Sequence, residues 1–165
     1  MPERREGRQL RMDSPLGLLR AGEREGAVTA LVFAGQKYER RHLPPEVPEE
    51  ETPLLRELRS WLEAYFDGER PDPRAIPVHP EGTAFQQRVW QALSEIPYGQ
   101  IVTYGQLADR LNSSPRAVGA AVGRNPVSVL IPCHRVLGAD GSLTGYAGGL
   151  ERKRRLLLLE GIRGI

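Results

Sequence analysis

A proline-rich segment in the middle of the chain separates two halves with different hydrophobic patterns. Residues 67–81 contain four prolines. Because proline lacks the backbone N–H that helices and central strands need, this segment is expected to be an irregular linker. The chain has 165 residues, enough for one domain or two small ones. The linker therefore predicts an N-terminal domain over residues 1–80, linker included, and a C-terminal domain over residues 81–165.

The first half combines strand patterns with one helix pattern. Apolar residues alternate in Gln9–Met12, Leu16–Leu19 and Ala27–Phe33, which predicts short strands joined by turns. Pro53–Phe66 repeats its apolar residues at the spacing of one helix face, and Thr52 precedes it as a plausible N-cap. We expect a small α/β domain with a short antiparallel sheet.

The second half is expected to be mainly helical. Hydroxyl residues that can accept from the free N–H groups of a helix start precede three periodic segments. They are Thr83 before a helix through Leu93, Thr103 before Tyr104–Leu111, and Ser113 or Ser114 before a helix starting at Pro115. The last two helices lie three residues apart, which predicts a helix-turn-helix.

The segments that follow complete a winged-helix pattern. Val127–Ile131 is apolar and β-branched, which predicts a buried extended segment. Gly138–Gly145 predicts a hairpin, the wing, and Leu150–Glu160 a final helix. The chain is therefore expected to have an α+β fold, in which a mainly helical winged-helix domain follows the α/β domain.

Charge is unevenly distributed between the halves. Residues 1–82 hold 13 Lys and Arg against 16 Asp and Glu, whereas residues 83–165 hold 10 against 5. The basic second half suits a polyanionic partner. No apolar run reaches the roughly 18 residues of a membrane-spanning helix, and the charged start of the chain lacks the apolar core of a signal peptide. A cytoplasmic protein without a membrane partner is expected.

The chain contains a single cysteine, Cys133. One cysteine excludes an internal disulfide and argues against a structural zinc site, so no metal is expected. A lone cysteine is more often a buried small hydrophobe than a nucleophile. His134 follows it directly, however, and an imidazole can take a thiol proton, directly or through a water. On composition alone both interpretations stay open.

The surroundings of Cys133 resemble a known active site. Residues 131–136, IPCHRV, resemble the active-site signature of the O6-alkylguanine-DNA alkyltransferases, and so do GTAFQ at 82–86, IPYG at 96–99 and GYAGG at 145–149. The resemblance covers about residues 82–161, while the first 80 match only in size and pattern. It implies DNA repair by direct reversal: the alkyl group of O6-alkylguanine in double-stranded DNA moves irreversibly to Cys133 after the base is flipped out, without a cofactor.

The resemblance also assigns catalytic roles near the cysteine. His134 corresponds to the family's water-linked base and Glu160 to the carboxylate that orients it. Asn125 corresponds to the asparagine that ties together the turn leading to the cysteine. Tyr104 corresponds to the tyrosine whose hydroxyl donates to the purine ring as the base leaves.

Further positions are implied to bind the damaged base and the DNA. Tyr146 resembles a wall of the base pocket, and the backbone N–H of Ala147 a donor to O6. The carbonyls of Cys133 and Val136 would accept from the guanine amino group. As residue types, Gly148 and Gly149 suggest open space in the pocket. Arg116 matches the arginine finger that fills the gap left by the flipped base.

Simpler interpretations accompany these roles. Glu160 could be an exposed helix-end charge, Tyr104 a packed aromatic, and the run at residues 152–155 is expected to be a solvated face. A winged-helix regulator with a structural cysteine explains the helix pair but not the polar set around Cys133. A cysteine hydrolase is a second rival. It would need a direct thiol–imidazole pair, but adjacent side chains on an extended segment point to opposite faces, so such a pair is geometrically poor.

The protein is expected to act as a monomer, and cooperative binding along DNA stays open.

Overall fold

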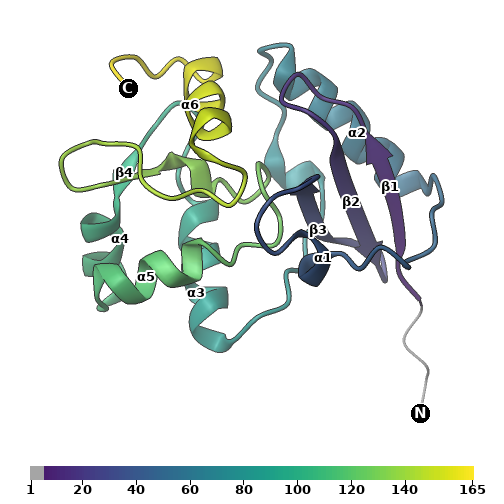
Figure 1. Ribbon diagram of the computed structural model, residues 1–165, viewed down its shortest axis with the longest axis horizontal. Coiled ribbons are helices and arrows are strands. Elements are labelled where there is room, and N and C mark those ends of the chain that lie inside the picture. Colours follow the sequence, from purple (N-terminus) through teal and green to yellow (C-terminus); the bar gives the residue numbers. More distant parts are fainter. Residues whose placement is uncertain (1–5) are drawn as a thin grey trace.

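The computed structural model describes residues 6–165. Residues 1–5 of the predicted N-terminal domain lie outside the described residues. Figure 1 shows a sheet covered by helix α2 on one side of the molecule and a mainly helical region, which includes the C-terminus, on the other. The fold is α+β, as predicted.

Three antiparallel strands form the sheet in the order β1-β2-β3. Their bounds are Arg8–Met12, Leu19–Arg24 and Ala27–Phe33. The strand predicted over Leu16–Leu19 is wrong, because the Ser14 hydroxyl accepts from Leu16 N and donates to Gly17 O, which closes a turn there. The true β2 escapes the alternation pattern because its polar residues, such as Arg20, are buried as well.

Two helices accompany the sheet, a short α1 (Glu39–His42) and the longer α2 (Pro53–Phe66). The longer helix has the predicted bounds, and the Thr52 hydroxyl caps it by accepting from Leu55 N at 3.1 Å. The linker after α2 is irregular apart from a 3₁₀ turn, η1 (Pro73–Ala75).

Helices α3 (Ala84–Ser94), α4 (Tyr104–Leu111) and α5 (Pro115–Val122) begin where their caps predict. The side chains of Thr83, Thr103 and Ser114 each accept a backbone N–H of the following helix. Between α4 and α5, Asn112 takes a left-handed conformation (φ 53°), so the two helices form the expected helix-turn-helix pair.

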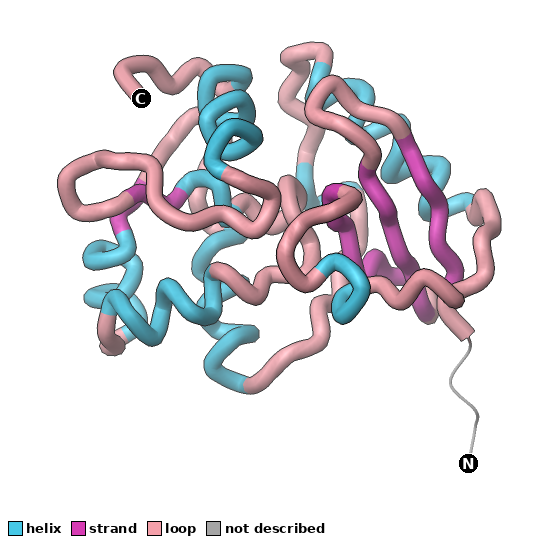
Figure 2. Tube along the Cα trace, viewed as in Figure 1, coloured by secondary structure: helices cyan, strands magenta, loops and turns pink. Residues whose placement is uncertain are grey.

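The segment after α5 departs from the prediction. Val127–Ile131 is buried, but it is a turn rather than an extended segment, because the Asn125 side chain bonds to backbone groups at both ends of it. A short 3₁₀ turn, η2 (Cys133–Arg135), follows. Figure 2 shows how much of the chain between α5 and α6 is loop.

The predicted wing hairpin has no strands either. Gly138–Gly145 is a loop, closed by the hydrogen bond from Gly138 N to Ser142 O and by the Asp140 carboxylate, which accepts from Ser142 N. Instead, β5 (Val136–Leu137), before the loop, pairs in parallel with β4 (Val102–Thr103). The last helix, α6 (Leu150–Leu159), ends at the C-cap residue Glu160.

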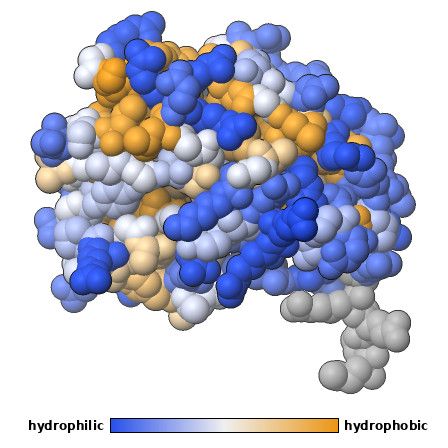
Figure 3. All heavy atoms as spheres, in the orientation of Figure 1, coloured by the Kyte–Doolittle hydropathy of each residue, from blue (hydrophilic) through white to orange (hydrophobic). Residues whose placement is uncertain are grey.

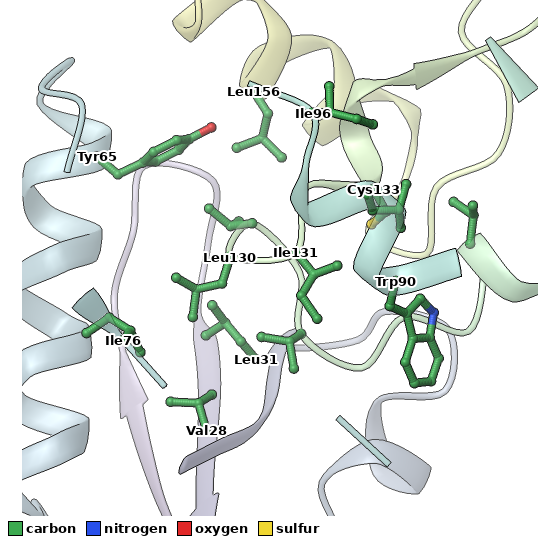
Figure 4. Packing of buried hydrophobic residues seen from close by; sticks show 14 of the residues in the cluster. Val28, Leu31, Tyr65, Ile76, Trp90, Ile96, Leu130, Ile131, Cys133 and Leu156 are labelled. Carbon is green, nitrogen blue, oxygen red and sulfur yellow. The ribbon is translucent and has the colours of Figure 1, made fainter. Parts of the chain in front are cut away.

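One hydrophobic cluster extends through both halves of the chain. Leu31 of β3 forms a parallel bridge with Val127, and Val28 forms one with Val78 of the linker. Figure 4 shows Leu31 and Val28 of the sheet in the same cluster as Leu130 and Ile131 near the cysteine. The face in Figure 3 is mostly hydrophilic, with apolar residues gathered in its upper part. Within residues 6–165, no helix has the length and apolarity needed to cross a bilayer.

Candidate active site

The side chain of Asn125 holds the turn that presents Cys133. Its Nδ2 donates to Ile131 O at 2.9 Å and to Val127 O at 3.4 Å, and its Oδ1 accepts from Val127 N at 3.0 Å. Cys133 N in turn donates to Ile131 O at 2.8 Å. The backbone before the cysteine is thus held by hydrogen bonds from one buried amide.

Cys133 faces a cavity of about 460 Å³. The cavity is lined from the sheet side, from α4 and α5, and from the loop before α6 by residues that include Lys37, Tyr38, Tyr104, Gly119, Ala120, Asn125, Ser128, Tyr146 and Ala147. Cys133 is buried, with 6% of the residue exposed. Burial raises its pKa, while the Asn125 amide and the Lys153 ammonium act in the opposite direction. A protonated thiol in this position needs a base before it can act as a nucleophile.

His134 and Glu160 form a fully buried pair behind the cysteine. Nε2 of His134 lies 2.7 Å from Oε2 of Glu160. Burial lowers the pKa of His134, although the hydrogen bond to Glu160 works against that shift. An ionised carboxylate can only accept, so we assign the imidazole proton to Nε2. Nδ1 is then unprotonated, and it has no hydrogen-bond partner among residues 6–165.

Glu160 is the centre of a larger cluster. Arg135 donates from Nε to Oε1 at 2.7 Å and from Nη2 to Oε2 at 3.0 Å, Tyr65 donates to Oε2 at 2.6 Å, and Gly99 N donates to Oε1 at 3.2 Å. Burial alone would raise the pKa of Glu160, but the hydrogen bonds from His134 and Arg135 outweigh it and hold the pKa far below its usual range. The alternative of an exposed helix-end charge is excluded by this burial.

Sequence reasoning missed Tyr65. It occupies the last apolar position of the α2 face, where it cannot be told from an ordinary core aromatic. The bond joins residues 95 positions apart, and no local pattern signals it.

Tyr104 and Tyr146 line the cavity on two sides. Burial raises the pKa of both phenols, and proximity to Cys133 adds to the shift in each. Tyr104 is the first residue of α4, and its ring lies 5.9 Å from Nζ of Lys153. The hydroxyl of Tyr146 is buried without a hydrogen-bond partner in the described part of the chain. Both phenols stay protonated near neutral pH and can donate.

The remaining base-binding candidates divide into two groups. Ala147 lines the cavity, its carbonyl accepts from Lys37 N, and its N–H has no acceptor among residues 6–165. Val136 is buried in β5 and does not line the cavity. Gly148 does not open space as expected: a Cβ there would lie 2.8 Å from the Tyr146 ring and 3.1 Å from Phe33, so this glycine allows close packing.

Arg116 projects from the second position of α5. The side chain is exposed, and it forms neither an ion pair nor a hydrogen bond with any residue from 6 to 165. It does not line the cavity, but Gly119 and Ala120 of the same helix do. One helix therefore connects the exposed arginine to the pocket of the cysteine.

The basic run at residues 152–155 is only partly a solvated face. Arg154 and Arg155 are exposed, as predicted. Lys153 is fully buried and donates to the carbonyls of Thr144 and Gly145, and burial lowers its pKa to about 8. Arg152 donates to carbonyls at Leu16 and Gly148. Lys153 and Arg152 thus act as hydrogen-bond donors to backbone carbonyls, three of which lie in the loop before α6.

Comparison with known proteins agrees with this geometry. A family model described as the DNA-binding domain of 6-O-methylguanine DNA methyltransferase matches residues 84–162. The methylated-DNA–protein-cysteine methyltransferase of Haemophilus influenzae is 48% identical over 151 residues, which cover 90% of this chain and 83% of that protein. Its counterpart in Methanosarcina acetivorans is 46% identical over 155 residues, covering 90% of this chain and 95% of the relative.

Solved structures show the same likeness. A crystal structure of Mycobacterium tuberculosis OGT in complex with DNA superposes with a TM-score of 0.80 at 40% identity, covering 94% of this chain and 92% of that one. The chain belongs to the methylated-DNA–protein-cysteine methyltransferase family.

Proposed function

We propose that this protein repairs alkylated guanine in DNA by direct reversal, as an alkyltransferase that uses Cys133 as its acceptor. The observation that carries the proposal is the position of the only cysteine. It lies in a cavity walled by Tyr104 and Tyr146, with the His134–Glu160 pair directly behind it. The names of the relatives agree with this reaction.

The transfer is one displacement. The Cys133 sulfur attacks the alkyl carbon on guanine O6, the S–C bond forms, and the C–O6 bond breaks with its electron pair staying on the guanine. The thiol proton passes to Nδ1 of His134 through one bridging water, and the Glu160 carboxylate stabilises the imidazolium that results. The product is a thioether, a poor leaving group, and no second cysteine exists to resolve it. Each molecule therefore acts once.

The leaving base is stabilised from the cavity wall. Charge that develops on the guanine is met by the Tyr104 hydroxyl and the free N–H of Ala147, in the manner of an oxyanion hole. Tyr146 forms one wall for the base. Gly148 keeps the Tyr146 ring in place by leaving room for it.

Access to a base in duplex DNA requires that the base leave the stack, at a cost of roughly a few kcal/mol. The exposed Arg116 is placed to enter the stack and offset part of that cost. We propose residues 81–165 as the DNA-binding and alkyl-acceptor domain and residues 1–80 as an N-terminal α/β domain. The protein acts as a monomer on double-stranded DNA in the cytoplasm.

The rival functions are not favoured. A non-catalytic regulator does not explain why Asn125, His134 and Glu160 are buried together around Cys133. The relatives are also named as methyltransferases. A hydrolase would need a direct Cys133–His134 pair, whereas Nδ1 of His134 has no hydrogen-bond partner among residues 6–165.

Replacing the nucleophile tests the proposal. Cys133→Ser should abolish alkyl transfer from an O6-methylguanine duplex in a single-turnover assay. Binding to the same duplex should stay within a few-fold of wild type, because phosphate and groove contacts do not involve the thiol. Alkyl transfer that persists in this variant would refute the mechanism.

A further inference from the structure

The phenol of Tyr65, in the N-terminal half of the chain, is hydrogen-bonded to the carboxylate of Glu160, in the C-terminal half. Tyr65 is the next-to-last residue of α2 and is 1% exposed. Its hydroxyl donates to Oε2 of Glu160 at 2.6 Å. Figure 4 shows this hydroxyl pointing away from α2, toward Leu156 of α6. The N-terminal half thus supplies a hydrogen-bond donor to the carboxylate that binds His134.

We propose that Tyr65 is a positioning residue for alkyl transfer, whose hydroxyl holds Glu160 and limits how strongly this carboxylate favours protonation of His134. This inference rests on the proposed function, because it assigns a role within the same reaction. Tyr65 lies outside the cavity of Cys133 and acts only through Glu160 and His134.

The Tyr65 ring is fixed independently of this hydrogen bond. It stacks on Trp61 with ring centroids 5.6 Å apart and planes 8° from parallel, and it makes edge contacts with Phe66 and Tyr98. The Trp61 ring is itself held, since Nε1 donates to Asp72 O at 2.9 Å. The hydroxyl is therefore already aimed at the carboxylate, and little side-chain freedom is lost in keeping it there.

Three donors share one oxygen of the carboxylate. Oε2 accepts from His134 Nε2 at 2.7 Å, from Tyr65 Oη at 2.6 Å and from Arg135 Nη2 at 3.0 Å. Burial raises the pKa of Tyr65, so the phenol stays protonated and can only donate to the ionised oxygen. A donor of this kind draws negative charge from Oε2, and the attraction between Oε2 and a protonated imidazole weakens.

Other ionisable groups face the pair, and Tyr65→Phe leaves them unchanged. Arg135 on η2 and Lys153 on α6 act on His134, and Arg135 acts on Glu160 as well. The phenols of Tyr98 and Tyr146, in the loops after α3 and before α6, do not shift the pair; burial and the charge of Glu160 raise their own pKa values, so both stay neutral. Because these groups remain, loss of the phenol hydroxyl leaves Oε2 a stronger acceptor for His134. The imidazole then stays protonated to a higher pH, where it cannot serve as the base.

The test compares Tyr65→Phe with Tyr98→Phe. Tyr98 is the matched control, because it packs against Tyr65 but its hydroxyl donates to Leu159 O and not to the carboxylate. Single-turnover transfer from a free O6-alkylguanine base is measured from about pH 5 to pH 8. The rate should fall at low pH, where His134 becomes protonated, and in Tyr65→Phe this fall (the acid limb of the profile) should lie about half to one pH unit higher than in wild type. At the lowest pH values the transfer rate should therefore be roughly three- to tenfold lower than that of wild type. The Tyr65→Phe plateau, and the whole Tyr98→Phe profile, should match wild type.

A second measurement needs no activity. The chain has three histidines, so the imidazole NMR signals can be assigned and followed with pH. The His134 midpoint should rise in Tyr65→Phe, and the additional mutation Glu160→Gln should abolish that difference. A profile that overlays wild type, or one that falls equally at every pH with the His134 midpoint unmoved, would show that Tyr65 is only structural.

The outcomes separate this inference from the proposed function. If wild type transfers the alkyl group and Tyr65→Phe leaves the limb unmoved, only the role of Tyr65 fails. If wild type acquires no alkyl group, the proposed function fails, and the His134 titration still decides whether Tyr65 acts on the imidazole.

Discussion

At the scale of single residues, the site depends on one buried carboxylate. Glu160 accepts five hydrogen bonds, from His134, Tyr65, Gly99 and twice from Arg135. A buried ion is tolerated only when it is paired and hydrogen-bonded, and this set of donors meets that need. The same bonds determine which nitrogen of His134 carries the proton, and they leave Nδ1 free for the thiol proton.

The pH dependence of transfer follows from these environments. The pKa of His134 is lowered by burial, so its imidazole is already neutral, and able to act as a base, at pH 7. Wild-type transfer from a free base should therefore be nearly flat from about pH 7 to pH 8. In His134→Gln the rate should depend on ionisation of the thiol itself, whose pKa is raised, and climb by about tenfold per pH unit.

Single-turnover rates across this range distinguish the two cases. Parallel profiles for wild type and His134→Gln would contradict a role for His134 as the base.

Much of the candidate site was implied by the family resemblance, because the motifs that carry the resemblance are local in sequence; the residue types alone left the role of Cys133 open. Cys133, His134 and Arg135 are adjacent, and Asn125 lies in the same segment. The donor Tyr65 and the buried cation Lys153 could not be inferred in the same way. Each looks like an ordinary member of its helix pattern until the fold brings it to a distant partner.

At the scale of elements, helix starts were predictable and strand-like loops were not. An N-cap is a bond between residues three apart, as at Thr83, Thr103 and Ser114, so the sequence specifies it locally. The turn at Val127–Ile131 depends instead on one amide side chain, that of Asn125, which overrides the β-branched pattern. The predicted wing, Gly138–Gly145, likewise forms no strands, because hydrogen bonds within the loop, and not the strand propensity of its residues, determine its conformation.

Helix α5 has two functions in the proposed mechanism. Its small residues Gly119 and Ala120 line the cavity, and Arg116 projects from its start into solvent. If Arg116 fills the gap left by the flipped base, Arg116→Ala should slow repair of duplex DNA by roughly ten- to a thousandfold. Transfer from a free O6-alkylguanine base should be unchanged, because that substrate pays no unstacking cost.

Single-turnover rates on both substrates, beside a melting curve, check this prediction. Equal slowing on duplex and free base, with a lower melting temperature, would make Arg116 a structural helix-start residue instead.

At the scale of the whole molecule, the N-terminal half takes part in building the site. Lys37 and Tyr38 line the cavity of Cys133, Tyr65 reaches Glu160, and one hydrophobic cluster joins both halves. The proline-rich linker marked a change in pattern, but it did not reveal these contacts, because they join residues far apart in sequence. Repair is therefore expected to require the full chain.

The central claim is permanent transfer of one alkyl group to Cys133, and intact-mass spectrometry tests it most directly. After incubation with excess O6-methylguanine duplex, each chain should gain the mass of one methyl group in place of one hydrogen, and peptide mapping should locate it on Cys133. The adduct should persist after the DNA is removed, since a thioether does not hydrolyse. An unchanged mass, a methyl group on another residue, or an adduct that disappears with turnover would contradict the account.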